Sequence, residues 1–240
     1  MNIKKIIAAL TGLSACLTLA SCAPSGGATN EELWRAAMTD AVFSEDEEIH
    51  DLVKLVPEDD RVIWDESNTR VLLLTWHNYA GECEPGGALG AEVGEIWATS
   101  VGEMIDRYEE SGDAEDWELW FAQKLGVHED EGYTRFTAFW VSPEDVIRPA
   151  YITDVTADMV NDYSAASDPE YKEWFDGNII YSYFESDYPW TRLGYTYDWS
   201  GGGSEYGLTE FLIFDGSKTE IEFTYTTDEF VDWLAGQANA

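Results

Sequence analysis

The sequence predicts an α+β domain built on a mainly antiparallel sheet of about six strands, with several helices packed on it. Three observations predict this class: six segments rich in β-branched and aromatic residues, helix-capping patterns between them, and no regular βαβ rhythm of the kind that indicates a parallel sheet. The strand segments are Arg70 to His77, Val93 to Ser100, Arg135 to Val141, Arg192 to Trp199, Gly207 to Phe214 and Glu220 to Tyr225.

The strand segments differ in the faces they are expected to bury. Residues 71–74 are consecutive apolar side chains, which is typical of a strand covered on both sides, so this strand is expected near the centre of the sheet. In residues 192–199 large apolar side chains alternate with small or polar ones, which is the period of a strand with one buried face.

Capping patterns and apolar stripes predict the helices. Residues 115–125 carry Trp117, Trp120 and Phe121 on one stripe and end before Gly126, so this helix is expected to lie on the sheet. A short acidic helix is expected around His50. Further helices are expected to start at Ser100, Ser142, Asp168 and just after Thr227.

The first 21 residues have the organisation of a secretory signal peptide. Lys4 and Lys5 precede an apolar run over residues 6–20. This run is shorter than the roughly 20 residues that cross a bilayer, so a membrane-spanning helix is the less favoured alternative. The run ends in Leu-Ala-Ser-Cys at residues 19–22, which resembles the lipobox of bacterial lipoproteins, where the cysteine is diacylated before cleavage.

The lipobox resemblance implies a location and a domain organisation. Cys22 is expected to become the lipidated N-terminus and to anchor the protein to a membrane of the bacterial cell envelope. Because Ala23 follows the cysteine instead of Asp, the outer membrane is expected if the cell is Gram-negative. Residues 22–30 have the composition of a flexible tether, and residues 31–240 are long enough for a single acidic domain.

The mature chain is strongly acidic. Without Lys4 and Lys5 it has 11 basic residues against 48 acidic ones, a formal net charge of −37. This charge argues against nucleic acid and bare anionic lipid as partners, and leaves cationic proteins, peptides or surfaces and divalent cations as candidates. A solvated acidic surface that has no specific partner is the simpler interpretation of the same composition.

Only one cysteine is expected to remain as a free thiol. Cys16 leaves with the signal peptide and Cys22 takes the lipid, so only Cys83 remains and no intramolecular disulfide is expected. The carboxylates of Glu82 and Glu84 disfavour its thiolate form, which argues for a structural or incidental thiol over a catalytic one.

Four segments of the chain resemble a family of uncharacterised secreted bacterial proteins. They are residues 70–77, 95–99, 139–149 and 188–199, in which aromatic and proline positions carry the likeness. The similarity covers about residues 60 to 215 and implies a single exported domain. It implies neither an activity nor any site residue.

The motifs of common enzymes are missing from the sequence. There is no Gly-rich phosphate loop followed by Lys, no His-Glu-x-x-His, no Cys-x-x-Cys and no Gly-x-Ser-x-Gly. Of the three histidines only His77 lies at the end of a predicted strand, where it suits either a general base or a hydrogen-bonded rim residue. An enzyme is therefore less favoured than a binding protein.

Acidic runs are weak candidates for a calcium site. Residues 44–48 and the run Glu129, Asp130 and Glu131 offer carboxylate oxygens, but neither matches the spacing of a calcium-binding loop closely. No cofactor is expected, and calcium is the alternative. A catalytic carboxylate pair for glycoside hydrolysis cannot be singled out among 48 acidic residues.

Aromatic side chains beside carboxylates are the remaining candidates for a ligand site. Residues 181–190 are dense in rings, and such rings either fill the core or stack on sugars and cationic groups. At the strand ends a ligand site is expected where the following residues meet: His77, Asn78, Tyr79, Tyr188, Trp190 and Arg192.

Three classes of function are compatible with these features. A non-enzymatic envelope lipoprotein that binds a protein, peptide or glycan partner is favoured by the composition and by the missing motifs. A carboxylate-dependent hydrolase and a divalent-cation-binding accessory protein are the alternatives. The sequence does not indicate an oligomeric state.

Overall fold

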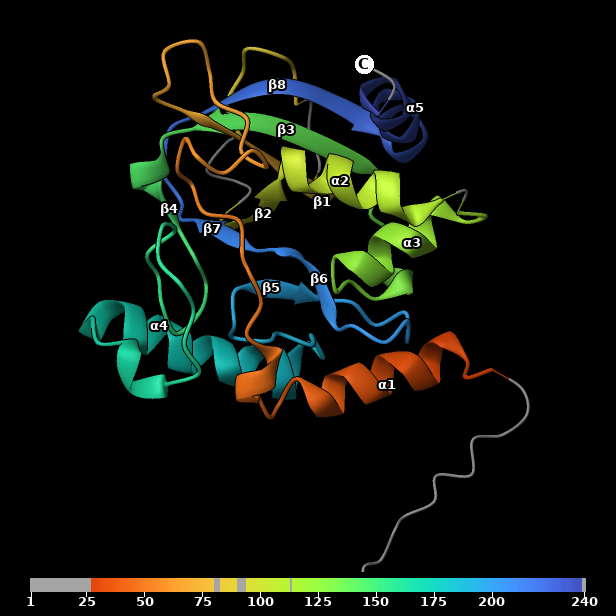
Figure 1. Cartoon of the computed structure of the whole chain (residues 1–240), viewed down its shortest axis with the longest axis vertical. Coiled ribbons are helices and arrows are strands. Elements are labelled where there is room, and N and C mark those ends of the chain that lie inside the picture. Colours follow the sequence, from red (N-terminus) through yellow and green to blue (C-terminus); the bar gives the residue numbers. More distant parts are fainter. Residues whose placement is uncertain (1–26, 80–82, 90–93, 113, 239–240) are drawn as a thin grey trace, which may run out of the picture.

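The computed structural model describes residues 27–79, 83–89, 94–112 and 114–238. Within these ranges six strands form an antiparallel sheet in the order β4-β7-β2-β1-β3-β8, and β5 and β6 form a separate pair (Figure 1). Together with the helices this confirms the predicted α+β class. The strands are β1 (Val71–His77), β2 (Ile96–Ser100), β3 (Arg135–Val141), β4 (Val146–Ile147), β5 (Tyr195–Tyr197), β6 (Tyr206–Thr209), β7 (Phe211–Ile213) and β8 (Thr219–Thr226).

The helices fall into two groups that lie at opposite ends of the view in Figure 1. α2, α3 and α5 lie beside the large sheet, whereas α1 and α4 lie below the β5–β6 pair. The α-helices are α1 (Asn30–Asp40), α2 (Val101–Ser111), α3 (Trp117–Lys124), α4 (Pro169–Ile180) and α5 (Thr227–Gln237). Short turns of 3₁₀ helix are η1 (Asp46–Glu48), η3 (Glu129–Glu131), η4 (Pro143–Asp145) and η5 (Tyr163–Ala165), and a π-helical turn, η6 (Tyr181–Glu185), extends α4.

Apolar side chains cover both faces of the central strand, as its sequence predicts. Leu73 of β1 belongs to one buried cluster, and Leu72 and Leu74 belong to another that contains Phe121 of α3 and Phe230 of α5. The predicted helix over residues 115–125 therefore does lie on the sheet. Burial of these side chains contributes about 1.5–3 kcal/mol each to folding.

Two strand predictions are corrected by the structure. The segment 207–214 is not one strand, because β6 pairs with β5 while β7 pairs with β2 and β4, and Glu210 lies at the break between them. The segment 192–199 contains only the three-residue strand β5, and it is buried on both faces. Its polar side chains find partners there: Thr196 Oγ1 donates to Lys124 O at 2.7 Å, and Asp198 pairs with the Lys124 ammonium.

The helix start at Asp168 is confirmed, the final helix α5 begins at Thr227 itself where it was expected just after it, and three other helix predictions are wrong or incomplete. Ser100 precedes α2 but donates its hydroxyl to Arg61 O and does not cap the helix. Ser142 precedes a single 3₁₀ turn, η4. His50 lies outside any helix, and the unforeseen helix α1 begins at Asn30 behind a capping box of Thr29 and Glu32.

The predicted signal peptide and the lipidation site Cys22 lie outside the described residues. Cys83 is half-buried and packs against the core cluster around Leu73. Among the described helices, none combines the length and the apolar character that a membrane span requires.

Candidate ligand-binding cavity

A cavity of about 700 Å³ lies between the large sheet, the β5–β6 pair and the C-terminal half of α4. Its described wall includes four tryptophans and six tyrosines, and the tryptophans are Trp76, Trp97, Trp174 and Trp190. Small-molecule sites in proteins typically enclose about 300–1,000 Å³ and are lined mainly by apolar and aromatic side chains. The cavity has the size and the lining of such a site.

The pairing of β1, β2 and β7 determines which side chains form one wall of the cavity. Leu74 of β1 pairs with Thr99 of β2, and Trp97 of β2 pairs with Leu212 of β7. Paired residues in an antiparallel sheet point to the same face, and residues two apart share a face. Glu210, two residues before Leu212, therefore lies on the same face as Trp97 and Thr99, and all three line the cavity.

Three tryptophans form a cluster along the wall. The ring centroids of Trp97, Trp174 and Trp190 lie 6.1–6.3 Å apart, and Trp190 meets the other two at steep angles. Trp190 is anchored because its Nε1 donates to Pro149 O at 3.1 Å, and Trp174 Nε1 donates to Glu95 Oε1 at 2.9 Å. These hydrogen bonds fix ring faces that are suited to a flat or cationic ligand.

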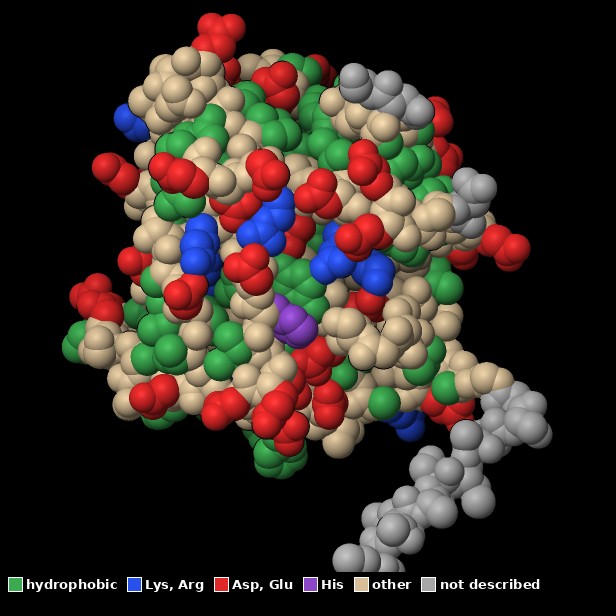
Figure 2. All heavy atoms as spheres, viewed as in Figure 1, with side chains coloured by type: hydrophobic (Ala, Val, Ile, Leu, Met, Phe, Trp, Pro, Cys, Tyr) green, Lys and Arg blue, Asp and Glu red, His purple; other side chains and the backbone are tan. Residues whose placement is uncertain are grey.

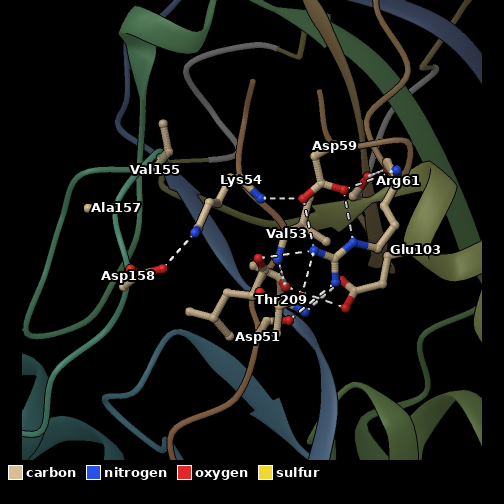
Figure 3. Close-up of polar contacts among 12 residues, drawn as sticks. Asp51, Val53, Lys54, Asp59, Arg61, Glu103, Val155, Ala157, Asp158 and Thr209 are labelled. Atoms are coloured by element: carbon tan, nitrogen blue, oxygen red, sulfur yellow. Dashed lines mark hydrogen bonds and ion pairs between the residues drawn. The ribbon is translucent and has the colours of Figure 1, made fainter. Parts of the chain in front are cut away.

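Glu210 is held in the cavity wall by its backbone. Its N–H donates to Gly194 O at 2.9 Å. On the preceding residue, Thr209 N donates to Glu103 Oε2 at 2.8 Å, and Thr209 Oγ1 accepts from Val53 N at 2.8 Å (Figure 3). The backbone at the break between β6 and β7 is thereby fixed, which sets the direction of the Glu210 side chain.

The side chain of Glu210 makes no hydrogen bond or ion pair with the residues that the structure describes. Its Oε2 is shielded from solvent and makes no hydrogen bond with any described residue. Burial raises the pKa of Glu210 to about 8, because no nearby cation compensates the charged form. A buried carboxylate without a partner lowers stability, so its presence in a cavity indicates a role other than folding.

Three more polar atoms of the wall lack partners. Trp76 Nε1, Thr99 Oγ1 and Asn178 Nδ2 are shielded and make no hydrogen bond. With Glu210 Oε2, four of the nine such side-chain atoms in the described parts of the chain belong to residues that line this one cavity. Buried polar groups in folded proteins nearly always have partners. Their concentration here points to a ligand or to ordered water that supplies the missing hydrogen bonds.

Three of the six residues predicted for a ligand site line this cavity, namely Tyr79, Tyr188 and Trp190. Tyr79 lies in the segment after β1, as expected for a strand end, whereas Tyr188 and Trp190 follow the helical turn η6. His77, Asn78 and Arg192 do not line it. Asn78 lies away from it on the surface, where its Nδ2 donates to Glu131 O at 3.3 Å.

His77 supports the cavity wall from behind. Its Nδ1 accepts from Tyr79 N at 3.0 Å, so Nε2 carries the proton and donates to Thr137 Oγ1 at 2.8 Å. Burial, with a contribution from Arg135, lowers the pKa of His77 to about 4, which keeps the ring neutral. The ring stacks on Tyr79 with centroids 4.0 Å apart, so both nitrogens are occupied and the ring positions Tyr79.

Arg192 connects two distant parts of the backbone. Its Nη2 donates to Ala41 O at 3.1 Å and to Val42 O at 2.9 Å, and its guanidinium lies over the rings of Tyr151 and Tyr183. The residue has a φ of +61°, a conformation that side chains other than glycine rarely adopt. Arg192 therefore fastens the segment after α1 to the core.

The predicted calcium residues are not brought together. Glu129, Asp130 and Glu131 form the exposed turn η3, and Glu129 Oε2 accepts from Asn30 Nδ2 at 2.7 Å. The described carboxylates that do meet are Asp40 and Glu48 near α1 and Glu205 before β6, with oxygens within 4.8 Å of one another.

Asp40, Glu48 and Glu205 line a second, open depression. Tyr197 donates its hydroxyl to Asp40 Oδ2 at 2.7 Å, and Tyr195 donates to Glu205. Burial and the adjoining carboxylates raise the pKa of Glu205 to about 7, and burial raises that of Glu48.

Comparison with models of known protein families found no match, and searches for similar curated proteins and for similar solved structures found none either. The resemblance to secreted bacterial proteins therefore stays a prediction from the sequence. The site has to be interpreted from its own geometry.

Proposed function

We propose that this protein is a non-enzymatic binding domain of the bacterial cell envelope and that it holds a small organic molecule, or the side group of a peptide or glycan, in the cavity. The observation that carries the proposal is that four residues with unpartnered, shielded polar atoms lie together in the wall of one aromatic cavity. Such a site offers ring faces for stacking and a few fixed polar groups for orientation.

A cavity-filling variant tests this proposal. Gly177 of α4 lines the cavity, and a Cβ added there meets no atom within 4 Å. Gly177→Phe is expected to place a ring in the cavity while the protein stays folded. Gly177→Ala is the matched control, because alanine leaves the cavity open and favours the helix by roughly 0.5–1 kcal/mol.

The measurement is saturation-transfer difference NMR with a mixed library of monosaccharides, amino acids and aromatic amines. Compounds that receive saturation from the wild-type protein and from Gly177→Ala, and lose it with Gly177→Phe, support a cavity ligand. A set of signals that is identical for all three proteins, or the lack of any signal, contradicts the proposal.

We also propose that lipid at Cys22 holds this domain on a membrane, with residues 22–30 as a tether. The signal-like run and the Leu-Ala-Ser-Cys ending support this location. Metabolic labelling with an alkyne analogue of palmitate is expected to label the wild-type protein and to leave Cys22→Ser unlabelled. Persistent label in Cys22→Ser would remove the anchor from the proposal.

A carboxylate-dependent hydrolase is the second candidate, because Glu48 and Glu205 both have raised pKa values and line the same depression. It is less favoured because tyrosine hydroxyls already bind Glu205 and Asp40. Hydrolysis of a nitrophenyl glycoside panel that disappears in Glu205→Gln would support it. The binding proposal predicts no turnover with either protein.

A further inference from the structure

The charges around the cavity have a single sign. Glu95 and Glu210 both line it, and none of the described residues in its wall is Lys, Arg or His. Glu95 lies exposed ahead of β2, whereas Glu210 Oε2 is shielded from solvent. A ligand that enters therefore passes one carboxylate and meets a second one inside.

The electrostatic field of the protein surface also favours a positively charged ligand. Acidic side chains are spread over the face in Figure 2, and the fewer Lys and Arg side chains gather near its middle. Among the basic side chains, Arg61 is engaged by Asp59 at 2.8 Å and Lys54 by Asp158 at 2.6 Å. A net charge of −37 for the mature chain raises the local concentration of cations.

Building on the proposed function, we infer that the ligand of the cavity is an organic cation, whose protonated amine or guanidinium group bonds Glu210 while its body lies against Trp97, Trp174 and Trp190. Indole faces attract cations through their quadrupole, and the effect grows when the cation is shielded from water. A carboxylate inside the same cavity supplies the countercharge.

The unpartnered atoms specify the cation further. When Glu210 is ionised its carboxylate accepts hydrogen bonds, which a primary or secondary ammonium or a guanidinium donates together with a compensating charge and a quaternary ammonium does not. Trp76 Nε1 and Asn178 Nδ2 are donors, so the ligand also carries an acceptor such as a hydroxyl or carbonyl oxygen. This describes an amine with a ring body and an oxygen function.

Matched pairs of probes separate charge from shape. Tyramine and tyrosol differ only in an ammonium against a hydroxyl group, as do cyclohexylmethylamine and cyclohexylmethanol. Isothermal calorimetry at pH 7 is expected to give at least tenfold tighter binding of each amine than of its alcohol. Glu210→Gln is expected to abolish that difference, and Glu118→Gln, the same substitution at an exposed residue of α3, is expected to preserve it.

Proton release gives an independent readout. The titratable groups around Glu210 are Glu95, Tyr171 of α4 and the cavity tyrosines, of which Tyr188 and Tyr195 have pKa values raised by burial. With a pKa of about 8, Glu210 is largely protonated at pH 7, and a bound ammonium favours its charged form. Amine binding is therefore expected to release up to about one proton, measured by comparing binding enthalpies in phosphate and Tris.

The results separate two proposals: that the cavity binds a ligand, and that this ligand is an organic cation. Amines that bind more tightly and release a proton support the cation. If alcohols bind as tightly as amines and binding is lost in Gly177→Phe, the inference that the ligand is a cation is overturned. The cavity then remains a binding site. No binding of any of the four probes at millimolar concentration overturns both.

Discussion

Glu210 occupies a position where stability alone favours an apolar side chain. It lies between two buried residues, Thr209 and Phe211, and its Oε2 finds no donor in the described parts of the protein. Residues that reduce stability without an evident compensation tend to mark functional sites. The proposed preference of the cavity for cations depends on this single side chain.

Replacing Glu210 by glutamine is expected to stabilise the free protein at alkaline pH. The pKa of Glu210 rises from 4.5 to about 8 on folding, so the charged form is disfavoured in the folded state and the penalty develops as the pH rises from about 4.5 to 8. At pH 9 Glu210→Gln should be more stable than the wild type by up to about 5 kcal/mol. At pH 5 both proteins should unfold at nearly the same urea concentration.

The control for this measurement is Glu118→Gln, which changes the net charge equally at an exposed site. Equal stabilisation by both substitutions would mean that general charge reduction explains the effect. Destabilisation by Glu210→Gln at pH 9 would contradict the claim that the Glu210 carboxylate lacks a hydrogen-bonding partner.

Strand ends and rings in the sequence predict six ligand-site residues, and three of these six lie in the wall of the cavity. Tyr79, Tyr188 and Trp190 line the cavity, whereas His77 and Arg192 are occupied by structural hydrogen bonds that a sequence does not reveal. Glu210 was missed although it carries a signal, since it is one carboxylate inside the otherwise apolar run Leu-Thr-Glu-Phe-Leu-Ile. A charged residue inside an apolar run of this kind is a candidate functional residue.

At the scale of elements, the change of sheet between β6 and β7 creates the cavity. β6 pairs with β5 outside the large sheet, and α4 closes the space between the β5–β6 pair and the large sheet. Gly194 stabilises this junction, because its carbonyl accepts from Glu210 N and its φ is +83°. A Cβ at this position would lie 2.5 Å from Cδ of the buried Arg148.

Gly194→Ala is expected to be strongly destabilising. Backbone strain at positive φ accounts for about 1–2 kcal/mol, and the contact with Arg148 adds about 1–3 kcal/mol. Gly203→Ala is the matched control, because its φ is also positive, +98°, while no atom lies within 4 Å of the added Cβ. Urea unfolding is expected to give a larger loss for Gly194→Ala; equal losses would mean that Arg148 does not constrain the junction.

Strands with strong patterns were predictable and short ones were not. β1 and β3 are long, apolar and buried, so their bounds follow closely from the sequence. β5, β6 and β7 contain three or four residues each, and their pairing depends on tertiary contacts. Helix α1 was missed because Gly and Ser residues before it indicated a tether, although Thr29 and Glu32 form a capping box.

At the scale of the whole molecule, carboxylates act on stability in opposite directions. Hydrogen bonds from Arg61 and from nearby backbone N–H groups outweigh the burial of Asp59 and lower its pKa, so its contribution is lost at acidic pH. Burial raises the pKa values of Glu205 and Glu210 to about 7 and about 8 from 4.5. The stability that their neutral forms provide is complete below about pH 4.5 and is lost as the pH rises through 7 and 8.

Thermal unfolding is therefore expected to show maximum stability at mildly acidic pH, between about 4.5 and 6. The melting temperature should fall from pH 6 to pH 8.5, and the double variant Glu205→Gln, Glu210→Gln should flatten this decline. A melting temperature that rises over the same interval would contradict the raised pKa values.

Salt is expected to stabilise the protein. A formal net charge of −35 produces self-repulsion that the unfolded chain relieves, and added ions screen it. The melting temperature should rise between 0.02 and about 0.5 M sodium chloride, and calcium should act at lower concentration. No response to either salt would indicate that the acidic surface is already neutralised by specific contacts.

The most direct test of the central claim, that the cavity binds ligand, is a titration of ¹⁵N-labelled protein with tyramine, followed through the indole N–H signals. The cavity indoles of Trp97, Trp174 and Trp190 are expected to shift together with one affinity. Trp140, whose Nε1 donates to Glu222 at 2.7 Å outside the cavity, and Trp233 of α5 are expected to stay unchanged. Shifts confined to Trp140 and Trp233, or no shift at all, would contradict the account.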